Sequence, residues 1–161
     1  MRILVLGVGN ILLSDEAIGV RLVEALAARY VLPDYVEIVD GGTAGMELME
    51  TMANRDHLII ADAVVSLKQP PGTVMMLCDD EVPVLFTNKI SPHQLGLADV
   101  LSALRFTDEF PKRITLVGVI PHSLEPHIGL TPVVTASFET ALACVLATLR
   151  EAGIPVTERA A

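Results

Sequence analysis

Three short runs of almost wholly apolar residues constrain the fold of this chain most strongly. They cover residues 2–8, 57–61 and 113–120, and each ends at a glycine, an aspartate or a proline. A strand that is covered on both faces has such a continuous apolar run, whereas a strand with one wet face alternates. An apolar content of 52% and a mean hydropathy of +0.54 fit the covered kind. The runs therefore predict parallel strands between layers of helices.

Segments with helical spacing alternate with these strands along the chain, which is typical of an α/β fold. We expect strands at residues 2–8, 35–39, 57–61, 73–78 and 113–120, and helices at 15–30, 45–52, 91–104 and 131–152, with an irregular stretch at 79–90. The length of 161 residues suits one domain. The prediction is a single three-layer domain over residues 1–153, with a mostly parallel, twisted five-stranded sheet and helices on both faces. Residues 154–161 are expected to form a flexible C-terminal tail.

The charge of the chain limits its partners. A formal net charge of -9 argues against nucleic acid, because phosphate binding requires a positive surface. No apolar run reaches the roughly 18 residues of a membrane span, so no membrane insertion is expected. Cys78 and Cys144 lie far apart and outside any metal-binding spacing, which is typical of reduced thiols in a cytoplasmic protein.

Three residues that can bind a metal follow predicted strands. Glu16 follows the first strand, Asp62 ends the third, and His93 opens the helix after the fourth. Ligands of α/β sheets lie beyond the carboxyl ends of strands, so the three can meet at one edge. Two carboxylates and an imidazole suit a first-row divalent ion and leave coordination positions open. Each residue also has a plain structural interpretation. Glu16 is then an acid in the first turn of a helix, Asp62 a turn or cap residue, and His93 a structural or solvated histidine.

Five blocks in this sequence resemble, in order, those of the hydrogenase maturation endopeptidases, and most closely the HybD-type members. The blocks are GVGNILLSDEAIGV at residues 7–20, DGGT at 40–43, the strand end at Asp62, SPHQ at 91–94 and GVIP at 118–121. The resemblance implies the α/β fold and a peptidase that removes a C-terminal extension from the precursor of the nickel–iron hydrogenase large subunit. It also implies that Glu16, Asp62 and His93 bind nickel, which belongs to the substrate precursor.

Several residues remain open to more than one interpretation. Asp40, Gly41, Gly42 and Thr43 are hypothesised to border the substrate tail, although a plain tight turn explains them equally well. His122 and His127, in the loop after the last strand, either line the cleft or are simply solvated. The sequence leaves the nucleophile open, and also whether the metal takes part in catalysis or only in recognition.

Two other functions compete with this interpretation. A nucleotide-binding oxidoreductase fits Gly7 and Gly9 after a strand, but Leu12 occupies the third-glycine position and two acids would face a pyrophosphate. A nickel-dependent binding module or chaperone that docks on the same precursor without cutting it would carry the same motifs. The zincin and serine-hydrolase motifs are absent from the sequence, so neither of those labels applies.

Overall fold

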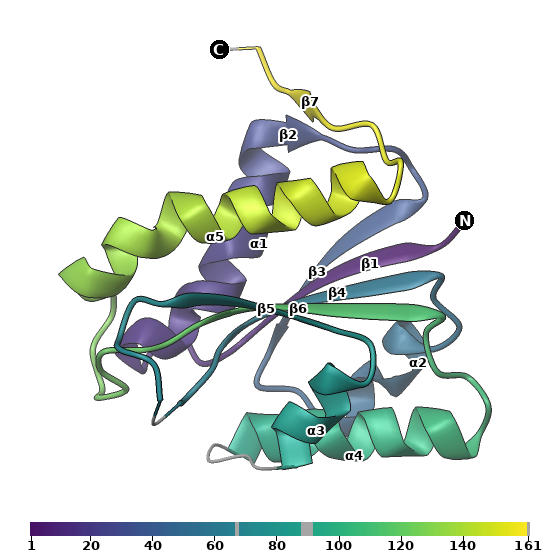
Figure 1. Cartoon of the computed structure of the whole chain (residues 1–161), viewed down its shortest axis with the longest axis horizontal. Coiled ribbons are helices and arrows are strands. Elements are labelled where there is room, and N and C mark those ends of the chain that lie inside the picture. Colours follow the sequence, from purple (N-terminus) through teal and green to yellow (C-terminus); the bar gives the residue numbers. More distant parts are fainter. Residues whose placement is uncertain (67, 88–91, 161) are drawn as a thin grey trace.

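The central layer is a five-stranded sheet with the strand order β3-β1-β4-β6-β5 (Figure 1). The computed structural model describes residues 1–66, 68–87 and 92–160, without the side chains of residues 86, 87 and 92–95. The strands are β1 (Ile3–Val8), β3 (Val36–Gly42), β4 (His57–Ala63), β5 (Val74–Cys78) and β6 (Arg113–Val119). All pairings are parallel except that of β5 with β6. The mostly parallel five-stranded sheet is therefore confirmed.

Helices cover both faces of the sheet. α1 (Ile18–Arg29) and α5 (Pro132–Glu151) lie on one face, and α2 (Met49–Met52), α3 (Glu81–Thr87) and α4 (Pro92–Phe106) lie on the other (Figure 1). Two short 3-10 helices, η1 (Ser14–Ala17) and η2 (Met46–Leu48), precede α1 and α2. The predicted three-layer architecture is confirmed.

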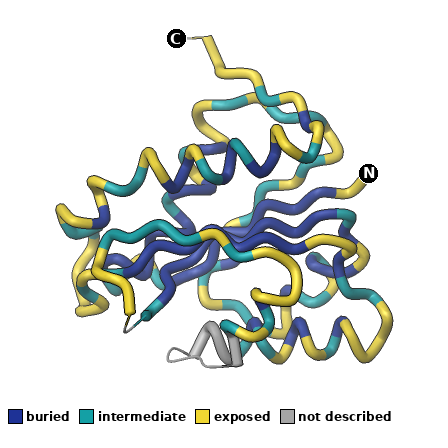
Figure 2. Tube along the Cα trace, viewed as in Figure 1, coloured by how far each residue is buried: buried dark blue, intermediate teal, exposed yellow. Residues whose placement is uncertain are grey.

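The alternation of side chains along β4 explains why its sequence is apolar throughout. Successive strand residues point to opposite faces. Ile59 and Ala61 belong to the core under α1 and α5, whereas Leu58 and Ile60 belong to the core under α3 and α4. Figure 2 shows the inner strands as buried along most of their length. Both faces of β4 therefore need apolar residues, and any polar side chain near its end requires a reason.

The last helix begins where the sequence predicts. The Thr131 side chain accepts a hydrogen bond from the backbone N–H of Val134 at 3.5 Å, and Pro132 occupies the first helical turn. By length and composition α5 would also suit a membrane span. Its stripe of Val134, Leu142 and Leu149 instead packs into the core against the sheet.

Two parts of the chain differ from the expected elements. Residues 81–87, expected to be irregular, form α3. Within the segment expected to be a flexible tail, Ile154 is 2% exposed, and β7 (Thr157–Glu158) pairs antiparallel with β2 (Tyr30–Val31). The structure therefore attaches much of that segment to the end of α1, and the domain boundary at residue 153 stays a prediction.

Candidate functional site at the carboxyl edge of the sheet

Two buried carboxylates lie where the central strands end. Asp62 is the penultimate residue of β4 and is 0% exposed. Glu16 lies in η1, after the loop of residues 9–13 that follows β1, and is 6% exposed. Asp62 shares the strand parity of Leu58 and Ile60, so it faces the layer that contains α4. The edge of the sheet therefore carries these two buried acids next to a third, Asp15, which is 0% exposed.

Two glycines allow η1 and α1 to lie directly on these strand ends. A Cβ on Gly9, which has φ +136°, would fall 1.9 Å from the backbone oxygen of Glu16. A Cβ on Gly19 would fall 2.1 Å from the backbone oxygen of Ala61 and 2.6 Å from that of Val8. No side chain fits at either place, because these distances are far shorter than a van der Waals contact. This contact fixes the position of Glu16 relative to the ends of β1 and β4.

Asp15 connects this edge to the loop between β6 and α5. One carboxylate oxygen accepts the backbone N–H of Thr131 at 2.8 Å. The other accepts the N–H of His122 at 2.8 Å, the N–H of Ser123 at 3.0 Å and the Thr131 hydroxyl at 2.8 Å. Burial alone would raise the pKa of Asp15, but the hydrogen bonds from Thr131, Ser123 and His122 outweigh burial and lower it.

The sequence places two residues with capping side chains, Ser14 and Asp15, at the start of the helix expected over 15–30, but neither caps it, because α1 begins after Ala17 and has no side-chain cap. Ser14 instead adopts φ +52° and donates its hydroxyl to the backbone oxygen of Glu125 at 2.6 Å. Its N–H donates to the carbonyl of His127, whose own N–H donates to Leu12. We call these contacts, together with those of Asp15, the loop strap. The sequence offers no signal for the strap, because its partners lie more than 100 residues away.

The first three residues of the DGGT segment end β3 and carry a bulge, and Thr43 follows the strand. The register with β1 passes from Gly7↔Asp40 to Val8↔Gly42, which leaves Gly41 between the two pairs. Gly42 has φ +51°, and its N–H donates to a side-chain oxygen of Asp40 at 2.9 Å. The backbone at these glycines is thus a bulge at the end of a strand, and the hypothesis that the segment borders the substrate tail stays a prediction.

The same segment also lines a cavity. An open cavity of about 240 Å³ lies between the ends of β1 and β3, and its walls include Ile11, Val20, Asp40, Gly42 and Thr43. Gly41 is buried and faces Leu6 instead. Three of the four residues hypothesised to border a substrate therefore line a cavity at the same edge of the sheet as Glu16 and Asp62.

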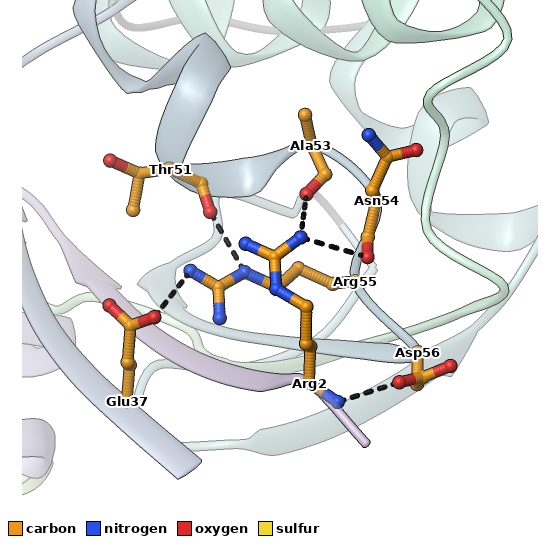
Figure 3. Close-up of polar contacts among 7 residues, drawn as sticks. All are labelled: Arg2, Glu37, Thr51, Ala53, Asn54, Arg55 and Asp56. Atoms are coloured by element: carbon orange, nitrogen blue, oxygen red, sulfur yellow. Dashed lines mark hydrogen bonds and ion pairs between the residues drawn. The ribbon is translucent and has the colours of Figure 1, made fainter. Parts of the chain in front are cut away.

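A larger cavity of about 570 Å³ lies away from this edge, along α2 and the amino end of β1. Figure 3 shows the polar contacts beside it. Arg55, 3% exposed, donates to the backbone oxygen of Thr51 and to Glu37, both at 2.9 Å, and Arg2 donates to the backbone oxygens of Ala53 and Asn54. These arginines hold the carboxyl end of α2, so the contacts are structural.

The third predicted ligand, His93, lies in the first turn of α4. Its side chain falls outside the described residues, so the predicted set of Glu16, Asp62 and His93 stays a prediction. Among the side chains that the structure describes, no group of three His, Cys, Asp or Glu residues is arranged to hold a metal ion.

The remaining histidines have different surroundings. His122 and His127 are exposed, and both contribute backbone groups to the loop strap. His57 is buried in β4, where a ring nitrogen lies 2.8 Å from the Thr115 hydroxyl. Burial lowers the pKa of His57, and the charge of Arg113 lowers it further. His57 is thus a structural residue of the sheet.

The chain is similar to known proteins in both sequence and structure. Residues 20–148 match the family model described as hydrogenase maturation protease. The hydrogenase 2 maturation protease of Escherichia coli K12 is 77% identical over 161 residues, which are 100% of this chain and 98% of that protein. The HupM hydrogenase expression/formation protein of Azotobacter chroococcum is 45% identical, over 98% of this chain and 76% of that protein.

Solved structures agree with the sequence comparison. The maturating endopeptidase HybD of E. coli superposes with a TM-score of 0.96 at 77% identity, over 99% of this chain and 98% of that one. The hydrogenase maturation protease HybD of Thermococcus kodakarensis gives a TM-score of 0.76 at 26% identity, over 92% and 99% of the two chains. The fold, its carboxyl-edge acids and these similarities lead to one conclusion: this chain belongs to the hydrogenase maturation protease family and is an endopeptidase.

Proposed function

We propose that this endopeptidase removes the C-terminal extension from the nickel-loaded precursor of a nickel–iron hydrogenase large subunit, in the cytoplasm. The observation that carries the proposal is the pair of buried carboxylates, Glu16 and Asp62, at the edge of the sheet where the helix of His93 begins. The relatives support the substrate, because their names describe proteases and proteins of hydrogenase maturation.

The chemistry of the donor set suits nickel. Glu16 and Asp62 would supply oxygen ligands and His93 a nitrogen ligand, a mixed set that takes first-row divalent ions. In this proposal the nickel arrives in the precursor, so it is part of the substrate. Binding by three residues of this chain leaves other coordination positions to the precursor's own ligands.

The carboxyl edge can then convert recognition of the metal into positioning of a peptide bond. A polypeptide gripped at Glu16 and Asp62 would extend over the neighbouring ends of β1 and β3, where Asp40, Gly42 and Thr43 line the cavity of about 240 Å³. Holding the scissile bond near the reacting groups supplies much of the rate enhancement in such reactions. Asp40, Gly41, Gly42 and Thr43 are therefore proposed to border the substrate tail.

The test is a cleavage assay with purified protein and nickel-loaded precursor, followed by mass spectrometry of the precursor. Loss of a C-terminal peptide is expected, and only from precursor that holds nickel. Stable binding without any loss of mass would instead indicate a nickel-dependent binding module or chaperone. Cleavage of nickel-free precursor at the same rate would refute the role of the metal.

Single-residue variants test whether Glu16, Asp62 and His93 form the site. Glu16→Gln and Asp62→Asn keep the shape of each side chain but remove its charge, and each is expected to lower cleavage at least about 100-fold, as losses at metal centres do. His93→Ala should do the same. Glu24→Gln and Asp99→Asn, on exposed helical surfaces, are the matched controls and should cleave normally. Normal cleavage by all three site variants would show that the site is elsewhere.

A further inference from the structure

β3 is an edge strand whose pairing leaves one side open. It pairs with β1, and with no other strand in the part of the chain that the structure describes. The N–H of Ile3 donates to Tyr35 at 3.0 Å, and the N–H of Gly9 donates to Gly42 at 2.7 Å. With the register Ile3↔Val36 and Val5↔Ile38, alternate residues of β3 face β1. The backbone groups of Val36, Ile38 and Asp40 therefore point outward.

These outward groups differ in what they contact. The N–H of Val36 donates to the carbonyl of Pro33 at 3.0 Å. Within the described ranges, neither Ile38 nor Asp40 has a backbone partner on the outer side. Ile38 is half-buried and Asp40 is exposed, so the edge is accessible at two consecutive outward positions. Backbone N–H and C=O groups that are unpaired along a strand edge are a template for the addition of another strand.

The open edge leads to the candidate site. Asp40, the last outward residue, also lines the cavity of about 240 Å³, together with Gly42 and Thr43 beyond it. An extended chain that lies along Ile38 and Asp40 would thus pass into that cavity. The cavity continues to Gly9, whose backbone is packed against Glu16. The open edge consequently leads into a cavity that borders the backbone of Glu16.

Charge decides which chain can occupy the edge. Asp40 is an exposed acid on this edge, Glu37 is paired with Arg55, and the whole molecule carries a formal charge of -9. A second copy pairing edge to edge would bring the two Asp40 side chains and two molecules of like charge together, and charge on an edge strand is a common means of preventing self-association. The edge therefore suits a different polypeptide with its own sequence.

We propose that the outer edge of β3 pairs with an extended segment of the precursor, which adds a strand to the sheet and delivers the scissile region to the carboxyl edge. The inference rests on the proposed function, because it takes the precursor as the substrate. It adds a contact made by the backbone of Ile38 and Asp40, which no side-chain motif records.

Proline substitution tests this contact, because it removes an N–H. Ile38→Pro deletes an outward donor and leaves the ladder with β1 intact, a change that edge strands accept. The matched control is Met76→Pro on β5, the opposite edge. The N–H of Ile120 donates to Thr73 at 2.9 Å, so with the register Met75↔Gly118 the N–H of Met76 also points outward.

With nickel-loaded precursor, Ile38→Pro is expected to raise KM about fivefold, the effect of one backbone hydrogen bond, with kcat unchanged. Met76→Pro should keep the wild-type KM. Ile38→Ala keeps the N–H and should raise KM by less than the proline does. Equal effects of Ile38→Ala and Ile38→Pro, or of the two prolines, would overturn the inference. Failure of the wild type to cleave would instead refute the proposed function.

Amide hydrogen exchange followed by NMR provides a readout that does not require turnover. In the free enzyme the amide of Ile38 should exchange quickly and that of Val39, which faces β1, slowly. Binding of the precursor should protect the amides of Ile38 and Asp40. Protection of both amides in the enzyme alone, together with a dimer in light scattering, would assign the edge to a second copy and contradict the proposal.

Discussion

Replacing Asp15 by asparagine should destabilise the protein by about 3 kcal/mol, because one buried carboxylate serves four donors. The amide of asparagine has one acceptor oxygen. In its best orientation that oxygen keeps His122, Ser123 and the Thr131 hydroxyl, and the amide nitrogen faces the N–H of Thr131. The orphaned buried donor costs about 1–3 kcal/mol.

The three remaining hydrogen bonds lose their charge assistance and weaken by roughly 0.5 kcal/mol each or more. For a chain of 161 residues, 3 kcal/mol corresponds to a fall in Tm of roughly 6–12 °C. Urea unfolding followed by circular dichroism measures the change in free energy, and Asp99→Asn, an exposed aspartate in α4, is the control. A loss below about 1 kcal/mol for Asp15→Asn, or a loss equal to that of the control, would refute the reasoning.

Three further predictions concern other parts of the fold. His57 has a lowered pKa, so as pH falls below about 6.5 the unfolded chain takes up a proton at this residue before the folded protein does. The free energy of unfolding, measured in urea, should therefore fall between about pH 7.5 and 5, and should fall less in His57→Gln. Parallel pH profiles for the two proteins would contradict this. Gly19→Ala should lower stability by about 2 kcal/mol despite the better helix propensity of alanine, because its Cβ would lie 2.1 Å from the backbone oxygen of Ala61; a rise in Tm would show that α1 can move without cost. Arg55→Ala should cost about 2–3 kcal/mol and Glu37→Gln less than about 1, since Arg55 is 3% exposed and Glu37 is 56% exposed; equal losses in chemical denaturation would disprove the asymmetry.

The three apolar runs were sufficient to predict the three inner strands, β1, β4 and β6, because a strand buried on both faces has little freedom in composition. The apolar run at residues 57–61 also predicted that Asp62 lies at the end of its strand. In the structure Asp62 is the penultimate residue of β4 and is 0% exposed. The start of α5 was predictable because Thr131 and Pro132 act locally. Most of the fold could therefore be predicted from local sequence signals and from the pattern of apolar residues.

The remaining features depend on contacts between residues far apart in the chain, which the sequence pattern does not predict. α3 was missed because Pro83 and the acids at 79–81 indicate a turn, whereas Val82 is fully buried and tertiary packing fixes the helix. The role of Asp15 was missed for the same reason, because its donors lie in another loop. The predicted meeting of Glu16 and Asp62 with His93 rests on a side chain outside the described residues.

The loop strap has a consequence for the order in which the molecule is made. Asp15 and Ser14 are synthesised early, but the groups that hold them belong to residues 122–131. A nascent chain that has emerged only as far as β5 therefore contains Glu16 and Asp62, and the glycines that pack η1 on the strand ends, but not the loop strap. The strap can close only after about four-fifths of the chain has left the ribosome, so an unfinished polypeptide presents both acids without the second of the two supports that hold η1.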